Sequence, residues 1–292
     1  MRASVSVLFI ALLSGSLAAC SSSSAPTCSF DDPPTLQQSA WPKFRHDRQN
    51  TGTVVNANVA SNPGALRWIF PTLSETPKGA FTASPVINNG DALIYIGSID
   101  GTEYAINVAD GTQDHGFFLM TPLPIASTAL LGLRDGKDAV FVAGGDGHLY
   151  AVDPTGTALV TNWPFSFNGY VSASPNLNLT DGTVYAGSLA GVLFAVCPNG
   201  IERFGVSTVG VQSSAAIGPD DTVYFGADDH QLRALLQDGT FRWTFATSTS
   251  ASIVTAPVVE ALASSAPGTP IPGAIPTPTP MTAAIYVADL SG

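Results

Sequence analysis

The chain has 292 residues, enough for one large domain or two ordinary ones. Charged residues make up only 11% of it, the formal net charge is −11, and the strong polar helix formers Glu and Lys number just 4 and 3. This composition excludes a helical bundle, a coiled coil, a basic nucleic-acid binder and a protein that docks on anionic lipid through a polybasic face. With 28 Gly and 22 Pro, the sequence favours a turn-rich, all-β protein.

Residues 1–19 have the pattern of a lipoprotein signal peptide. Arg2 precedes an apolar run over residues 5–13, which is too short to span the ~30 Å hydrocarbon layer as a helix. The following Leu-Ala-Ala-Cys resembles the bacterial lipobox, in which the cysteine is acylated and becomes the mature N-terminus. We therefore expect lipid on Cys20 and a flexible tether over residues 20–40, which begins with four serines. An ordinary secretory signal with an incidental cysteine is the alternative.

An internal repeat decides the fold class. Five segments align without gaps, each running from a β-branched residue through small residues toward a turn: residues 94–101, 140–147, 184–191, 223–230 and 285–292. The turn positions of four of them are glycines: Gly101, Gly147, Gly191 and Gly292. The first four segments resume as apolar strands, so each predicts a β-hairpin with a turn that tolerates positive φ.

Two further strands complete each repeat. Short apolar segments precede the hairpins at residues 83–87, 127–131, 173–177, 213–217 and 255–259. A fourth strand is expected after a glycine turn behind each of the first four hairpins. Four strands in ~40–46 residues match one propeller blade. The sequence therefore predicts an all-β propeller of four-stranded antiparallel blades over residues 41–292, with four complete blades and a partial fifth.

The fourth strands carry the residues of a known motif. The patterns that begin at Ala105, Ala151, Ala195 and Ala234 resemble the tryptophan-docking repeat AxDxxTGxxxW of quinoprotein-type, PQQ-like β-propellers, and the motif's Asp is present only as Asp153. Residues 41–52 and 64–70 are similar to the lead-in of the same family, with residues 66–70 expected as an outer strand. One lipoprotein member of that family is the propeller subunit of the machinery that assembles outer-membrane β-barrel proteins.

Five aromatic residues occupy the docking position, namely Trp68, Phe117, Trp163, Phe204 and Trp243. We interpret them as groups that pack neighbouring blades together, because one buried aromatic ring removes ~150–250 Å² from water. Stacking on a ligand is the alternative. Members of this family usually have seven or eight blades, so the strand count suggests a truncated or split product, or an open arc completed by a partner or a second copy.

No reaction is evident from the side chains. The four histidines lie in four different segments, and the Asp pairs at 220–221 and 228–229 lack the spacing of a calcium loop. We therefore expect no catalytic, metal-binding or cofactor-binding residues. The resemblance implies one enzyme alternative, a fragment of a PQQ- and Ca²⁺-dependent quinoprotein dehydrogenase. The chain lacks the adjacent cysteines of the alcohol-oxidising branch, and no calcium set maps onto it.

The preferred hypothesis is a non-enzymatic, protein-binding scaffold, exported and lipid-anchored to the bacterial cell envelope. Ser21 after Cys20 is compatible with the outer membrane. We expect a protein partner in the envelope and no binding of nucleic acid. We expect the protein to contact the membrane only through its lipid anchor. An extracellular ligand- or carbohydrate-sensing module is a further alternative.

Two local features stay open. Cys28 and Cys197 could form a disulfide in an oxidising compartment, but Cys28 lies in the expected tether and Cys197 in a turn. Residues 261–282 are rich in proline and cannot join a sheet centrally, so we expect an extended surface insertion there rather than a partner ligand.

Overall fold

The computed structural model describes residues 6–9, 28, 35–37, 41–52, 66–71, 79–90, 92–134, 137–157, 162–247, 250–261 and 283–289. Within these ranges the regular secondary structure consists entirely of β-strands. Over the same ranges, no helix has the length and apolar character that crossing a bilayer requires.

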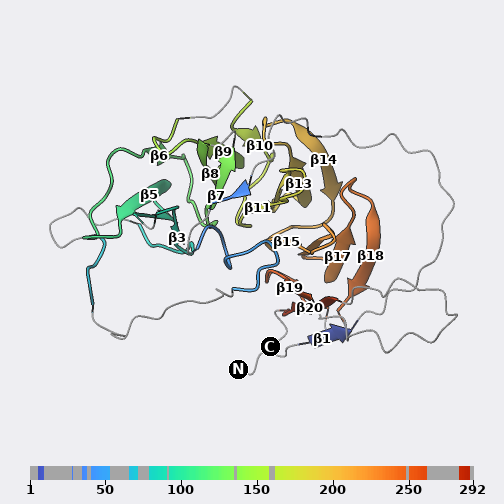
Figure 1. Cartoon of the computed structure of the whole chain (residues 1–292). Helices are drawn as coiled ribbons and strands as arrows, with labels where there is room; N and C mark the ends of the chain where they lie inside the picture. Colours follow the sequence, from blue (N-terminus) through green and yellow to red (C-terminus); the bar gives the residue numbers. More distant parts are fainter. Residues whose placement is uncertain are drawn as a thin grey trace, which may run out of the picture.

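The strands form five antiparallel sheets that follow one another around an arc (Figure 1). Blade 1 contains β3 (Val86–Ile87), β4 (Leu93–Gly97), β5 (Thr102–Asn107) and β6 (Leu119–Met120). Blade 2 contains β7 (Leu130–Arg134), β8 (Lys137–Gly144), β9 (His148–Val152) and β10 (Phe165–Ser166). Blade 3 contains β11 (Asn176–Leu177), β12 (Val184–Gly187), β13 (Val192–Val196) and β14 (Glu202–Ser207). Blade 4 contains β15 (Ala216–Ile217), β16 (Val223–Gly226), β17 (Gln231–Leu235) and β18 (Phe241–Ala246).

The fifth sheet contains β19 (Val258–Ala261) and β20 (Ala283–Val287), with β1 (Ser6–Phe9) paired to the outer edge of β20. Four complete four-stranded blades and a partial fifth confirm the predicted fold class. The Pro-rich residues 262–282 lie outside the described ranges, as do residues 1–5 and 10–27, which include Cys20.

Two features of the strands differ from the sequence prediction. Blade 2 gains an extra strand, β2 (Thr35–Leu36), which pairs with β7 through Thr35 and Leu133. Residues 66–70 were expected to form an outer strand, and this is wrong, because the structure shows irregular backbone there. An outer strand needs a third strand of its own blade to pair with, and residues 66–70 instead lie against blade 1 through side-chain contacts.

The hairpins at the centre of the blades follow directly from their sequences. In blade 3, Val184 pairs with Val196 and Gly187 with Leu193. Blade 4 repeats this register with Val223 on Leu235 and Gly226 on Leu232. β-Branched and aromatic residues favour the strands, and the turn between them is made of small residues and Asp or Gly. The same spacing in each repeat therefore gives the same register in each blade.

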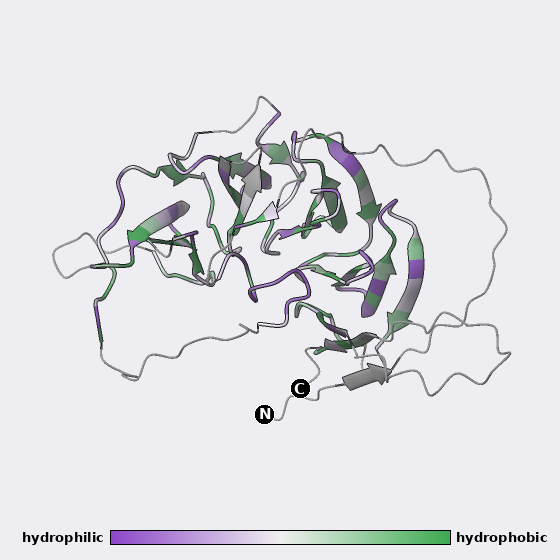
Figure 2. Cartoon of the chain, in the orientation of Figure 1, coloured by the Kyte–Doolittle hydropathy of each residue, from purple (hydrophilic) through white to green (hydrophobic). Residues whose placement is uncertain are grey.

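The hydrophobic core lies between the sheets. Four clusters of buried side chains fill the contacts between successive blades, and Figure 2 shows the hydrophobic colour concentrated on their strands. The largest fully buried rings are those of Tyr95, Phe141, Phe167, Tyr185 and Phe225. Blades 2, 3 and 4 are thus covered on both faces by their neighbours, and blade 1 and the fifth sheet are each covered by a neighbouring blade on one face.

Candidate functional site

The hairpin glycines form one end of the blades, which we call the hairpin rim. Gly101, Gly147 and Gly191 have φ angles of 85°, 83° and 88°, in the left-handed region that favours glycine. Their carbonyl oxygens accept hydrogen bonds from the segments that follow the outer strands, for example from the amide of Thr208 to Gly191 at 2.6 Å. In blade 4, His230 takes the same position with a φ of 67°. Gly292 lies outside the described residues.

The docking aromatics lie where one blade meets the next. The indole Nε1 of Trp163 in blade 2 donates to the carbonyl of Pro198 in blade 3 at 3.0 Å. The ring of Phe204 in blade 3 lies 2.8 Å from the place a Cβ on Gly239 of blade 4 would occupy. Since Gly239 also has a φ of 84°, any other residue there would be strained and would displace the ring. In this motif, an aromatic side chain of one blade therefore packs against a turn glycine of the next blade.

The other three predicted aromatics occupy related positions. Trp68 donates its indole N–H to Val108 at 2.9 Å and covers the turn glycine Gly111 of blade 1. Phe117 is buried and packs edge-on against Tyr95, with ring centroids 5.1 Å apart. Trp243 packs beside the cluster between blade 4 and the fifth sheet. All five rings therefore contact protein side chains or turns.

Trp163 tests the docking contact. Its side chain is only 5% exposed, so Trp163→Ala should lower the free energy of unfolding by about 3–5 kcal/mol. Trp163→Phe keeps a ring but leaves the buried Pro198 carbonyl unpaired, and should lower it by about 1–3 kcal/mol. Urea denaturation followed by circular dichroism measures both values, with the half-exposed Phe241→Ala as the matched control. Equal stability of Trp163→Ala and this control would contradict the docking role.

A chain of hydroxyl groups, not foreseen from the sequence, links the blades near their first strands. The amide of Ser84 donates to Thr128 Oγ1 at 3.0 Å, that of Thr128 to Ser174 Oγ at 2.9 Å, and that of Ser174 to Ser214 Oγ at 2.8 Å. Ser213 Oγ continues the chain to the carbonyl of Thr255 at 2.9 Å. A hydroxyl residue at the same position of successive repeats was the available signal.

Residues 41–52, which we call the hub segment, bond to the first strand or its flanking residues in every sheet. Their carbonyl oxygens accept from the amides of Ile87 in blade 1, Leu131 in blade 2, Ile217 in blade 4 and Val259 in the fifth sheet, at 2.7–3.0 Å. The Arg48 carbonyl also accepts from the Asn176 side chain in blade 3 at 2.9 Å. In Figures 1 and 2 this hydrophilic segment runs through the middle of the arc.

Two buried polar side chains hold the hub segment in shape. Lys43 Nζ donates to the carbonyls of Phe44 and Asp47, at 2.5 and 2.8 Å, and to Asn50 Oδ1 at 2.7 Å. The amide nitrogen of Asn50 donates to the carbonyls of Ala215 and Pro257, at 3.2 and 3.1 Å. Burial lowers the pKa of Lys43 to about 7, against the attraction of the Asp47 carboxylate. The polar groups at the centre are thus bonded to the chain itself.

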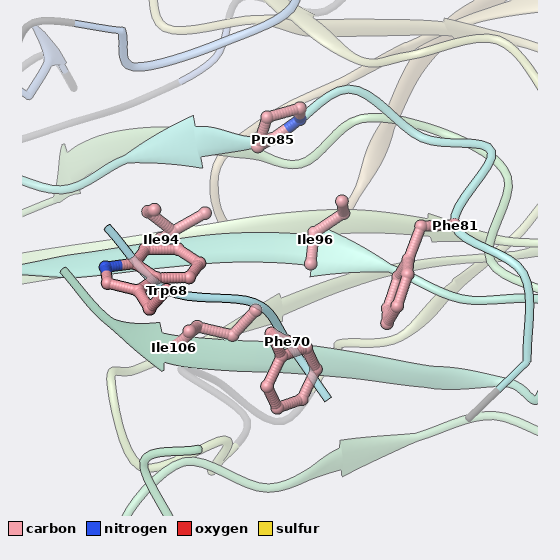
Figure 3. A pocket seen from close by; sticks show the side chains of 7 residues that line it. All are labelled: Trp68, Phe70, Phe81, Pro85, Ile94, Ile96 and Ile106. Atoms are coloured by element: carbon pink, nitrogen blue, oxygen red, sulfur yellow. The ribbon is translucent and has the colours of Figure 1, made fainter. Parts of the chain in front are cut away.

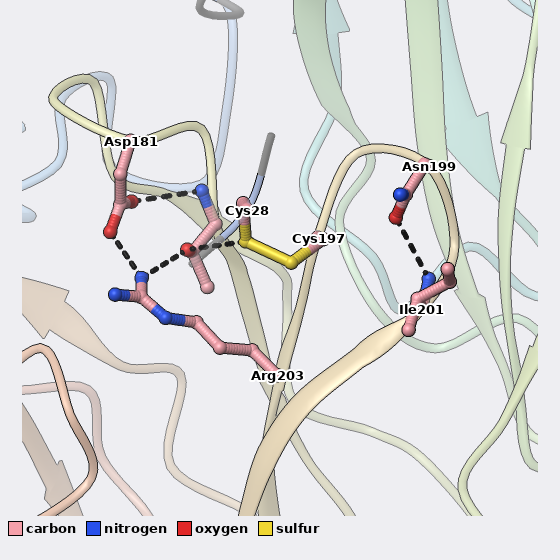
Figure 4. Close-up of a disulfide and its surroundings, with 7 residues drawn as sticks. Cys28, Asp181, Cys197, Asn199, Ile201 and Arg203 are labelled. Atoms are coloured by element: carbon pink, nitrogen blue, oxygen red, sulfur yellow. Dashed lines mark hydrogen bonds and ion pairs between the residues drawn. A yellow bond between two sulfur atoms is a disulfide. The ribbon is translucent and has the colours of Figure 1, made fainter. Parts of the chain in front are cut away.

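The opposite ends of the blades carry the turns that follow the first and third strands, and we call this end the turn rim. Arg203 pairs there with Asp181 in blade 3, and Arg242 pairs with Asp220 in blade 4. Figure 4 shows that the Cys28–Cys197 disulfide lies beside the first of these pairs. The structure thus resolves the open question of whether these cysteines pair, and it attaches the N-terminal segment to blade 3.

Both rims expose large apolar side chains. Those on the hairpin rim are Ile99, Met120, Leu123, Leu189 and Val209. Those on the turn rim are Phe118, Leu179, Ile201, Leu236 and Phe241. Loops that a rigid scaffold positions are common places for binding residues.

An apolar pocket of about 220 Å³ lies on the face of blade 1 that points away from blade 2 (Figure 3). Its lining consists of Trp68, Phe70, Phe81, Pro85, Ile94, Ile96 and Ile106. A small-molecule site usually combines apolar walls with a few convergent polar groups. These lining residues form an apolar surface without convergent polar groups. The surfaces by which two blades pack together have the same character.

No site for PQQ with Ca²⁺ can be assembled from the residues that the structure describes. In the ranges that the structure covers, no three His, Cys, Asp or Glu side chains converge in a way that could hold a metal ion. The buried amine and amide nearest the centre, those of Lys43 and Asn50, are bonded to backbone and to each other. We therefore derive no chemical step through that cofactor.

The fold and these contacts define a β-propeller of four-stranded repeats whose blades are joined by docked aromatic residues. Residues 37–245 match the model of the family described as outer membrane protein assembly factor BamB, so the chain belongs to that family. This confirms the family predicted from the repeat. BamB from Moraxella catarrhalis is one similar solved structure, with 16% identity, a TM-score of 0.49, and coverage of 61% of this chain and 56% of that chain. The match thus spans little more than half of that protein. No curated protein matches the chain.

Proposed function

We propose that the chain is a non-enzymatic protein-binding scaffold, anchored by lipid on Cys20 to the cell envelope, at the outer membrane. The observation that carries the proposal is the hub segment. Its backbone and the Asn50 side chain bond to all five sheets from the centre of the arc, and the buried Lys43 bonds within the segment itself. We assign partner binding to the two rims, both of which expose apolar side chains on short loops.

The family supports this role, since its model is described as an outer membrane protein assembly factor. The lipid anchor is supported by the Leu-Ala-Ala-Cys sequence and by the serines behind it. Anchoring would hold the rims near partners in the same membrane and raise their local concentration without any new contact.

The test uses the full chain expressed in a Gram-negative host. The chain should incorporate radiolabelled palmitate and fractionate with the outer membrane, whereas Cys20→Ala should lose the label and the matched Ser22→Ala should keep it. Purified from the envelope, the chain should retain an integral outer-membrane protein.

Two double variants, one on each rim, then distinguish specific binding of a partner from non-specific adsorption to exposed apolar side chains. Ile99→Asp with Leu123→Asp changes the hairpin rim, and Ile201→Asp with Leu236→Asp changes the turn rim. Removal of exposed anchors at an interface typically costs ~2 kcal/mol or more, so one of the pairs should reduce retention at least ~30-fold. Retention that neither pair reduces would overturn the scaffold proposal.

A further inference from the structure

The disulfide changes how the lipid tether holds the propeller. In the acylated chain, which would begin at Cys20 and lack β1, the first described contact with a blade apart from this disulfide is β2 at Thr35, fifteen residues after Cys20. The Cys28–Cys197 bond moves the first attachment to residue 28, eight residues after Cys20. Cys197 directly follows the third strand of blade 3, so this attachment lies on the turn rim.

The attachment point is firmly built. The amide of Cys197 donates to Ile201 and its carbonyl accepts from Gly200, so the turn is closed on both sides. The Sγ of Cys28 lies 3.6 Å from Thr183 Oγ1, and that hydroxyl accepts from Arg203 at 2.8 Å (Figure 4). The cysteines therefore connect the tether to the turns after both the first and the third strand of blade 3.

The length of the tether determines which rim faces the bilayer. Any eight-residue chain reaches at most ~28 Å, and a Ser-rich coil of that length has an r.m.s. span of ~16 Å. The five residues of β13 alone span ~17 Å between the rims, and the turns at both ends add to this height. A bilayer against the hairpin rim would thus require a nearly extended tether, which costs conformational entropy.

We infer that the Cys28–Cys197 disulfide orients the propeller on the membrane, with the turn rim toward the bilayer surface and the hairpin rim directed away from it. This orientation depends on the lipid anchor proposed above. Both rims expose apolar side chains, so surface character alone would not choose between them. The hairpin rim, with Ile99 and Leu189, is then the face presented to partners that approach from the aqueous side.

The experiment measures the distance of each rim from a membrane. A fluorescent amino acid replaces either Ile201 on the turn rim or Leu189 on the hairpin rim, which are 53% and 42% exposed on the same blade. The acylated full chain is reconstituted in phosphatidylethanolamine and phosphatidylglycerol vesicles that contain a rhodamine-labelled headgroup. Energy transfer from position 201 should exceed transfer from position 189 at least about two-fold, because the strand separates the two by ~17 Å or more.

Two variants test the cause. Cys28→Ser with Cys197→Ser should bring the two transfer efficiencies closer, since the r.m.s. span of the tether rises to ~22 Å. A twenty-residue Gly/Ser insertion after Ser24 keeps the disulfide and the fold while raising the span to ~30 Å, and should make the efficiencies nearly equal. The insertion decides the matter if the cysteine variant does not fold.

The outcomes distinguish this inference from the anchor itself. If the wild-type chain floats with vesicles and Cys20→Ala does not, the anchor holds. Equal transfer from both rims in that floating chain would then overturn the orientation alone. If the wild-type chain does not float, the anchor and the orientation both fail.

Discussion

Replacing Lys43 with methionine is expected to lower the free energy of unfolding by roughly 3–5 kcal/mol at pH 7, since it removes one partner of a buried, hydrogen-bonded network. The variant keeps the volume of the side chain but leaves the carbonyl oxygens of Phe44 and Asp47 and the side-chain oxygen of Asn50 without their donor. These acceptors fix the bends by which the hub segment reaches all the sheets. Arg67→Met, which removes an exposed charge, should change stability by no more than ~0.5 kcal/mol.

The pH dependence of this difference follows from the direction of the pKa change. The pKa of Lys43 falls from 10.5 to about 7 on folding, so between these values the unfolded chain binds a proton that the folded chain does not. Stability of the wild type therefore rises with pH across this window, by up to about 5 kcal/mol in total. The difference in the free energy of unfolding between wild type and Lys43→Met should therefore increase from pH 7 to pH 9.5, as measured by urea titrations. A difference that stays constant over that range would contradict a pKa of Lys43 that burial lowers to about 7.

Replacing Glu103 with leucine should raise the free energy of unfolding by roughly 2–4 kcal/mol, the combined effect of removing a buried unpaired polar group and adding apolar burial. Glu103 is 1% exposed, and neither of its carboxyl oxygens has a hydrogen-bond partner among the residues that the structure describes. The equivalent positions of blades 2, 3 and 4 are Leu149, Leu193 and Leu232, all buried. The midpoint of thermal unfolding should rise by about 2–4 °C per kcal/mol in a chain of this size.

Glu103 also has a signature in pH. Burial raises the pKa of its carboxyl well above 4.5, so the folded chain holds a proton that the unfolded chain releases. Its contribution to stability is therefore greatest below pH 4.5 and decreases as the pH rises toward the folded pKa. Glu103→Gln should abolish this decrease while leaving a polar group in place. Glu202→Leu, at an exposed strand start, is the matched control and should alter neither stability nor its pH dependence. A Glu103→Leu chain less stable than wild type would contradict this account.

The repeat predicted the architecture well because each element of a blade is encoded locally. The alternation of β-branched residues and the glycine turns set the register of hairpins such as β12 with β13. The alanine of the docking motif also has a local reason, since Ala195 pairs with Phe204 and Ala234 with Trp243, a small residue opposite a large ring. The prediction of a strand at residues 66–70 was wrong because apolar alternation does not show whether a partner strand is available for pairing.

The candidate site was harder to predict, since it depends on contacts between distant segments. The lead-in motif at residues 41–52 was visible, but not its bonds to Ile217 and Val259. The pairing of Cys28 with Cys197 joins residues 169 apart, which spacing alone does not indicate. The sequence shows that Glu103 occupies the repeat position at which the next three repeats have leucine. Its burial, however, depends on the packing of blade 1 on blade 2.

The hub segment has a consequence for how the molecule folds. Repeat arrays whose units touch only their neighbours can nucleate anywhere and gain stability one unit at a time. Here Asn50 is bonded to Pro257, 207 residues later in the chain, so the hub segment cannot complete its contacts before the fifth sheet has been synthesised. Such long-range closure slows folding, and it makes the modules melt together in a single transition. A chain of this kind would expose its apolar strands for longer before the hub segment closes on them.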